Sequence, residues 1–102
     1  MSSKQYSVRY LPVFYEDLRR AVNHIAYTLN NPNAADALLN KTEDAILRTL
    51  SNPTFAPAYQ GTTQTKHYKI RIGNYFAFYV VYDNIVEMRR FLYRKRDLTS
   101  LL

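Results

Sequence analysis

The chain has 102 residues, a formal net charge of +6 and no cysteine. A chain of this length is expected to form one domain, covering 1–102, with a single modest core. The lack of cysteine excludes disulfides and thiolate chemistry, and no apolar run is long enough for a signal peptide or a membrane span. We therefore expect a cytoplasmic protein.

The first part of the chain predicts a short strand followed by a helix. Apolar and polar residues alternate from Tyr6 to Leu11, which is typical of a strand, and Pro12 ends this pattern. From Phe14 the spacing changes to offsets of four, three and four, which predicts an amphipathic helix over 14–30. The apolar stripe of this helix consists of Leu18, Val22, Ile25 and Leu29.

A second helix is expected after a short connector that contains Pro32. Asn33 is the predicted N-cap, and a stripe of apolar residues continues to Asn52-Pro53. The two helices should pack as an antiparallel hairpin, because the connector is short. The pairs Glu16-Asp17 and Glu43-Asp44 are predicted on solvated helical faces, and His24 is given no role. Residues 52–65 have no periodicity and predict a loop.

The last third of the chain reads as three strands joined by turns at Gly73-Asn74 and Asp83-Asn84. In the first of these strands, Tyr68, Ile70 and Ile72 alternate with His67, Lys69 and Arg71, so one face should be apolar and the other cationic. Ile70 is predicted at the centre of the core. The middle run from Tyr75 to Tyr82 is apolar at both parities, as a central strand requires.

This order of elements predicts an α+β fold of the form βααβββ. The helical hairpin is expected to pack on one face of a twisted, mainly antiparallel four-stranded sheet. Residues 66–97 hold eight Lys or Arg against three acids, whereas the rest of the chain holds six against five. Such a local excess of positive charge suits either a polyanion or an acidic protein partner.

The opening RYLPVFYEDLRRAVNHIAYTL, the predicted hairpin and the ending IGNYFAFYVVYDNIVEMRRFLYRKRDL together resemble the RelE/ParE family of bacterial toxins from type II toxin-antitoxin modules. The resemblance covers nearly the whole chain. It implies a toxin that forms a hetero-oligomer with an acidic antitoxin protein, which wraps over it. It also implies one of two activities, because RelE-like members cut mRNA on the ribosome without a metal and ParE-like members poison DNA gyrase.

Cleavage of mRNA by an adjacent 2′-hydroxyl needs a base, an acid and cations that stabilise the developing charge. The strand YKIRI resembles the YKIKL strand of RelE, and RKRD resembles a GKRE motif that follows the last strand in RelE-like members. His67 shares a face with two cations, which would keep it a neutral base near pH 7. The predicted catalytic residues are Lys69, Arg71, Arg96, His67 and Tyr93, and the predicted RNA-binding residues are Lys66, Arg89, Arg94 and Lys95. No metal or cofactor is expected.

Two departures weaken the resemblance to RelE. Phe76 stands where RelE carries an arginine, and Leu98 to Leu102 contain no tyrosine to match the one near the end of RelE. The segments YFAFYVV and LYRKRDL resemble ParE-like members at least as well. The sequence therefore favours an mRNA interferase (a metal-independent endoribonuclease) by a small margin. A gyrase inhibitor is the alternative, and a non-toxic basic binding module on the same scaffold is the second alternative.

Overall fold

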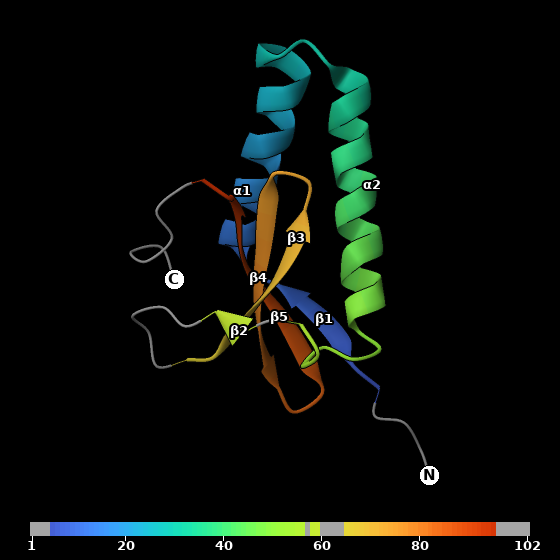
Figure 1. Ribbon diagram of the computed structural model, residues 1–102, viewed down its shortest axis with the longest axis vertical. Coiled ribbons are helices and arrows are strands. Elements are labelled where there is room, and N and C mark those ends of the chain that lie inside the picture. Colours follow the sequence, from blue (N-terminus) through green and yellow to red (C-terminus); the bar gives the residue numbers. More distant parts are fainter. Residues whose placement is uncertain (1–4, 57, 60–64, 96–102) are drawn as a thin grey trace.

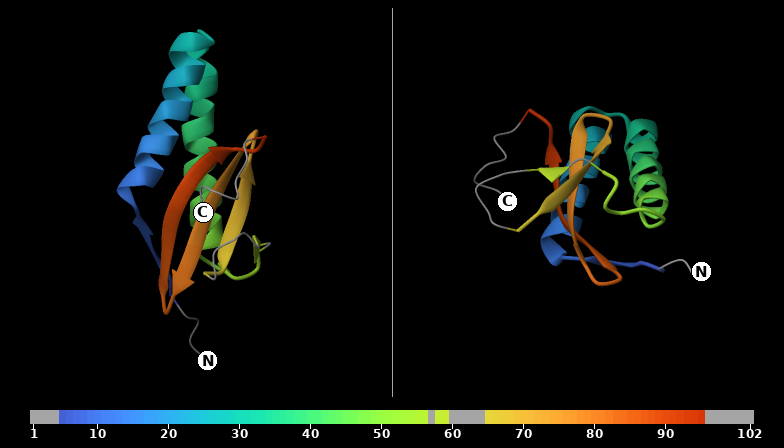
Figure 2. Two further views of the ribbon diagram at one scale, coloured as in Figure 1. Left: turned by 90° about the vertical axis from the view of Figure 1, so that its left-hand side faces the viewer. Right: turned by 60° about the horizontal axis from the view of Figure 1, so that its bottom comes forward.

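The computed structural model describes residues 5–56, 58–59 and 65–95, and the predicted catalytic residue Arg96 lies outside these ranges. In chain order the elements are β1 (Ser7–Tyr10), α1 (Pro12–Asn23), the π-helix η1 (His24–Thr28), α2 (Pro32–Thr49), β2 (Ala58–Tyr59), β3 (His67–Ile72), β4 (Tyr75–Tyr82) and β5 (Ile85–Tyr93). The helices form a hairpin on one side of a twisted sheet (Figures 1 and 2). The predicted α+β fold is confirmed, and the short strand β2 is added within the predicted loop 52–65.

The strands follow the order β1-β5-β4-β3-β2 across the sheet. Strands β3, β4 and β5 form the predicted antiparallel meander, with β4 in the middle. Strand β1 lies parallel to β5, with Val8 beside Val86 and Tyr10 beside Met88. A parallel neighbour needs a long connection, and here the helical hairpin and three strands separate β1 from β5 along the chain.

Three residues, Asn30, Asn31 and Pro32, end one helix and begin the next. Asn30 has a φ of 51°, the left-handed conformation in which helices commonly terminate. The side chain of Asn31 accepts a hydrogen bond from the Ala34 N–H at 3.1 Å, and Pro32 occupies the first turn. The prediction of Asn33 as the N-cap is therefore wrong, because a proline fits inside the first turn of a helix as well as before it.

The first helix also differs from its predicted range of 14–30. It begins at Pro12, because proline fits the first helical turn and Leu11 keeps an extended conformation in front of it. At its other end the helix widens into η1, where the Leu29 N–H donates to the His24 carbonyl at 3.0 Å. A π-helix shifts the residues that follow it around the helix axis, and single π turns are frequent at functional sites.

The core lies between the hairpin and the sheet. Its buried members are Phe14, Ala21, Leu38, Ala45, Ile46, Tyr68, Ile72, Ala77, Tyr79, Val86, Met88 and Phe91. The predicted stripe residues Leu18, Val22, Ile25 and Leu50 are partly buried around this cluster. Ile70 was expected at the centre but is only partly buried, because β3 lies towards the edge of the sheet. Phe14, which is fully buried, packs edge-to-face on Phe91 in its place.

Asp17 corrects the prediction that all the acidic pairs lie on solvated faces. It is buried on α1, and its carboxylate accepts hydrogen bonds from Arg90 Nε at 2.7 Å and from the Phe91 N–H at 3.0 Å. Strand β1 ends opposite Met88, so Asp17 satisfies a backbone donor of β5 beyond the end of β1. Glu16, Glu43 and Asp44 are exposed, as predicted.

A bulge in β5 explains why its alternation is irregular in the sequence. Phe78 lies opposite Arg90 and Tyr79 opposite Met88, so Arg89 is an extra residue on this strand. The bulge lets Met88 and Phe91, which have opposite parity in the sequence, enter the same core.

The face of the sheet that is opposite the helices is called the outer face below. By strand alternation it carries Phe78 and Val80, which are buried although they lie outside the cluster beneath the helices. This explains why β4 is apolar at both parities. In the described part of the chain, no helix has the length and apolar character that crossing a membrane requires.

Candidate functional site

Lys69 and Arg71 of β3 lie on the outer face, and Lys66 precedes this strand. Lys69 lies beside Phe78 and Arg71 beside Phe76 across the β3–β4 ladder. The Lys69 ammonium sits over the Phe76 ring, 4.7 Å from its centroid, and the Lys66 ammonium sits 5.3 Å from the centroid of Tyr68. Arg71 Nε donates to the Gly73 carbonyl at 3.1 Å. In these contacts, each of the three cations therefore has a different partner.

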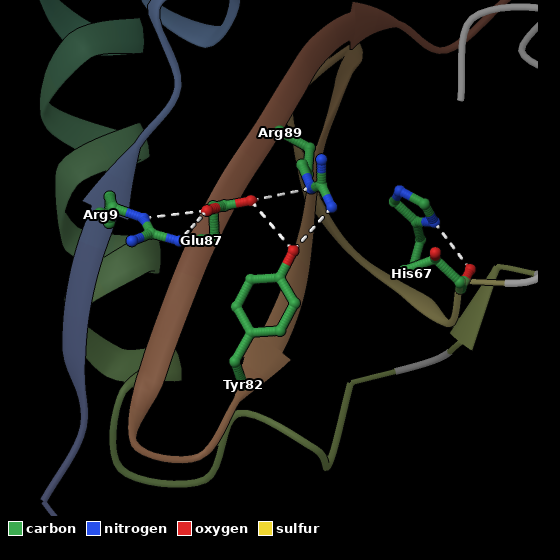
Figure 3. A network of polar contacts seen from close by, with 6 residues as sticks. Arg9, His67, Tyr82, Glu87 and Arg89 are labelled. Atoms are coloured by element: carbon green, nitrogen blue, oxygen red, sulfur yellow. Dashed lines mark hydrogen bonds and ion pairs between the residues drawn. The ribbon is translucent and has the colours of Figure 1, made fainter.

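His67 is buried at the start of β3, although the sequence suggested an accessible base. Its Nδ1 lies 3.0 Å from the Thr65 carbonyl oxygen (Figure 3). A carbonyl only accepts hydrogen bonds, so this contact requires the proton on Nδ1 and leaves Nε2 as the nitrogen able to accept one.

A buried carboxylate that sequence reasoning missed organises the arginines near β1. Glu87 on β5 pairs with Arg9 of β1, and its Oε1 lies 3.1 Å from Arg89 Nε (Figure 3). The Tyr82 hydroxyl donates to Glu87 Oε1 at 3.3 Å and accepts from Arg89 Nη2 at 2.8 Å. The side chain of Glu87 is 6 % exposed. The predicted RNA-binding residue Arg89 is therefore paired with a carboxylate within the sheet.

The other predicted residues lie at the far end of β5. Tyr93 is opposite Tyr75 and packs against its ring, on the side of the sheet that the helices cover. The sheet therefore separates Tyr93 from Lys69, and the structure does not bring the predicted catalytic tyrosine and lysine together. Arg94 and Lys95 are exposed, and the Arg94 N–H donates to the Asn74 carbonyl at 2.9 Å.

An apolar groove of about 610 Å³ opens between the helical hairpin and this end of the sheet. We call it the hairpin groove. Its lining includes Arg20, His24, Ile25, Leu29, Tyr75 and Tyr93. Burial, followed by the neighbouring Tyr93, raises the pKa of Tyr75, so its hydroxyl stays protonated well above neutral pH. The groove therefore offers apolar surface with a few polar groups at its margin, which suits a protein partner or an organic ligand.

The sequence contained signals for both features that were missed. Glu87 stands between the core residues Val86 and Met88 in a strand otherwise rich in arginine, and such an isolated acid suggests a buried ion pair. The stripe of the first helix continues to Leu29, which remains 59 % exposed in the structure. An apolar stripe that extends beyond the sheet it covers indicates a docking surface.

The fold and the site together define a class of small basic α+β proteins with a helical hairpin, a mixed sheet and an apolar groove at one end. Among solved structures, a chain of the chromosomal ParDE TA system from P. aeruginosa has this fold, with a TM-score of 0.74. The two share 12% sequence identity, and the match covers 89% of this chain and 98% of that chain. A comparison with curated protein sequences gave no match.

The family is identified by sequence. Residues 8–98 match the family model of the ParE toxin of the type II toxin-antitoxin system parDE. The chain therefore belongs to the ParE toxin family. Membership implies a cognate antitoxin as a partner.

Proposed function

We propose that this toxin inhibits DNA gyrase and does not cleave mRNA. The proposal reverses the order of the two activities that the sequence favoured. Its main support is the arrangement of the residues expected to cleave RNA: Lys69 lies over Phe76 on the outer face, and Tyr93 lies on the other side of the sheet. General acid–base catalysis requires its groups within hydrogen-bond reach of one phosphate.

Two further observations support this order. Phe76, which occupies the place of an arginine in RelE, contacts both Lys69 and Phe78 and supplies no charge for a phosphorane. Arg89, a predicted RNA-binding residue, is paired with the buried Glu87. The match to the ParE family model over residues 8–98 agrees with the proposal, because ParE-like members of the wider family poison gyrase.

Cleavage of mRNA remains the second candidate, and one observation favours it. Lys69 and Arg71 share a parity on β3 with His67, whose Nε2 is the nitrogen left able to accept a proton. If RNA entered along β3, these residues would meet the same segment of its backbone.

Two assays run in parallel test the proposal. Purified toxin should block supercoiling by gyrase and trap gyrase–DNA cleavage complexes, and primer extension after induction should show intact translated transcripts. Lys69→Ala should leave gyrase inhibition within about twofold of the parent, because its ammonium packs over the Phe76 ring on the sheet surface and a single surface cation contributes little to stability. Phe76→Arg, which restores the arginine of RelE, should not create mRNA cleavage. Cut transcripts with unaffected gyrase would refute the proposal and support the second candidate.

We also propose that the antitoxin inserts an apolar segment into the hairpin groove. Leu29 is 59 % exposed at the groove, so Leu29→Glu should leave the fold intact and weaken antitoxin binding by about tenfold or more. Leu47→Glu is the matched control, because Leu47 is 57 % exposed on α2 and does not line this groove. Equal affinities of the two variants in a titration with purified antitoxin would place the apolar contact elsewhere.

A further inference from the structure

A second, smaller groove lies at the other end of α2, beside the edge of the sheet. Its volume is about 320 Å³, and it is bounded by the last turns of α2, by residues 51–56 and by β3. We call it the edge groove. Phe55 in its wall is 84 % exposed, the highest value among the large hydrophobic residues of the described part. An aromatic side chain so exposed beside a groove indicates a contact surface.

The edge groove contains a section of strand that has a neighbour on one side only. β2 pairs with β3 at His67 and Tyr68, and no other described strand continues the sheet beside Ile70 and Arg71. Ile72 and Tyr75 flank a two-residue turn, so they form a hydrogen-bonded pair, and Arg71 belongs to the alternate, non-bonded pair. The N–H and carbonyl of Arg71 consequently point away from β4, towards the groove. Such an edge accepts an added strand.

The side chains around this edge specify what the added strand should carry. Side chains of a strand alternate between the two faces of the sheet. Every second side chain of the added strand would therefore contact Ile70 and Phe55, and the side chains between them would contact that of Arg71. Arg48 of α2 adds a second exposed guanidinium. Neither arginine makes an ion pair within the described ranges, although Asp44 lies one helical turn before Arg48. Apolar residues therefore fit the first parity and acidic residues the second.

We propose that the edge groove binds an extended acidic segment of a protein partner, which adds to β3 in line with β2. Main-chain hydrogen bonds to Arg71 hold the segment in register. Its apolar side chains contact Phe55 and Ile70, and its carboxylates face Arg71 and Arg48. A nucleic acid could use the aromatic ring and the arginines, but it cannot pair with the strand edge, which is why a peptide fits better. This inference does not depend on whether the toxin acts on DNA gyrase or on mRNA.

The test measures fluorescence anisotropy with a short, blocked, labelled peptide in which Glu alternates with Val around a central Phe. Phe55→Ala and Arg48→Ala should each weaken its binding by about five- to tenfold, because each removes one contact of the groove. Tyr27→Ala and Arg19→Ala are matched controls, since both residues are exposed on the first helical segment. They should change the affinity by less than twofold. Equal losses in the controls would overturn the proposal.

Strand addition is tested with the same peptide methylated on its backbone nitrogens. Methylation at one parity should reduce binding by about tenfold or more, and methylation at the other should have little effect, because only alternate amides face β3. Equal effects at both parities would exclude an added strand. Displacement of the labelled peptide by oligothymidylate at a lower concentration than by the unlabelled peptide would identify a nucleic-acid site instead. Loss of binding in Leu29→Glu would place the peptide in the hairpin groove, and either result would overturn the proposal.

Discussion

At the scale of single residues, the stability of the sheet near β1 depends on Glu87. Its buried carboxylate pairs with Arg9, whose side chain is 55% exposed, and with Arg89, whose side chain is 30% exposed. Removing the carboxylate would leave Arg89 partly buried without its counter-charge. We expect Glu87→Ala to lower the free energy of unfolding by about 3 kcal/mol, as breaking a buried pair usually does.

Arg9→Ala provides the comparison for Glu87→Ala. Arg9 can be hydrated when it is unpaired, and Glu87 would keep Arg89 and Tyr82, so the expected loss is about 1 kcal/mol or less. Urea denaturation of both variants measures the difference. Equal losses would mean that the pair acts by joining β1 to β5 and that the burial of charge has little influence.

Tyr79 predicts a specific sensitivity to alkaline pH. Its hydroxyl donates to the Pro53 carbonyl, and burial, with a smaller effect of Tyr68, raises its pKa from 10.0 to about 12. A group whose pKa is raised by folding stabilises the protein fully below its unfolded value and loses that contribution as the pH rises through the folded value. The parent should therefore lose stability between about pH 10 and pH 12, by on the order of 2 kcal/mol from this group.

Tyr79→Phe isolates this contribution from that of the other tyrosines. At pH 7 the variant should be less stable than the parent by about 1 kcal/mol, because the Pro53 carbonyl loses its donor. The difference should shrink and then reverse as the pH approaches 12. Thermal melts of the two proteins across this range measure it, and a constant difference would contradict the assignment.

At the scale of elements, the packing of α1 against β5 depends on Asp17. Its carboxylate binds Arg90 and the Phe91 N–H where β1 no longer covers β5. Asp17→Ala should cost about 3 kcal/mol, because it leaves the buried Phe91 N–H without its acceptor and removes the carboxylate that pairs with Arg90. Hydrogen exchange of the Phe91 amide should become faster than in the parent. Glu16→Ala, at the exposed neighbouring position, should change neither quantity, and an equal effect there would refute this role.

The sequence predicted the helices and strands better than it predicted the contacts between them. Periodicity located both helices of the hairpin and every described strand except the two-residue β2, because the core face of each of these elements is mainly apolar. Local sequence patterns do not indicate contacts between residues that are distant in the chain. Such contacts determine the partner of β1, the bulge at Arg89 and the burial of Asp17.

For the site, the sequence placed Lys69 and Arg71 on one strand but could not show that Tyr93 lies on the other side of the sheet. That separation depends on the register and on the bulge in β5. The apolar stripe that reaches Leu29 indicates a docking surface, but the shapes of the two grooves could not be predicted, because each is formed by residues from helices and strands that are far apart in the sequence.

At the scale of the whole molecule, the net charge of +6 is concentrated on the surface. Among the described residues, the buried carboxylates of Asp17 and Glu87 are each paired with arginines. The exposed cations, among them Arg94 and Lys95, therefore produce a long-range field that attracts an acidic partner. The hairpin groove, by contrast, is lined mainly by apolar and aromatic side chains.

This division predicts how salt affects the complex with the antitoxin. Raising the salt concentration to 1 M shortens the Debye length to about 3 Å, which removes the long-range attraction between exposed charges. The association rate should therefore fall by about tenfold or more. The dissociation rate should change by only about twofold, because salt does not weaken apolar contacts in the groove. Stopped-flow mixing with purified antitoxin measures both rates, and a dissociation rate that rises as steeply as the association rate falls would show that ion pairs, and not the groove, hold the bound state.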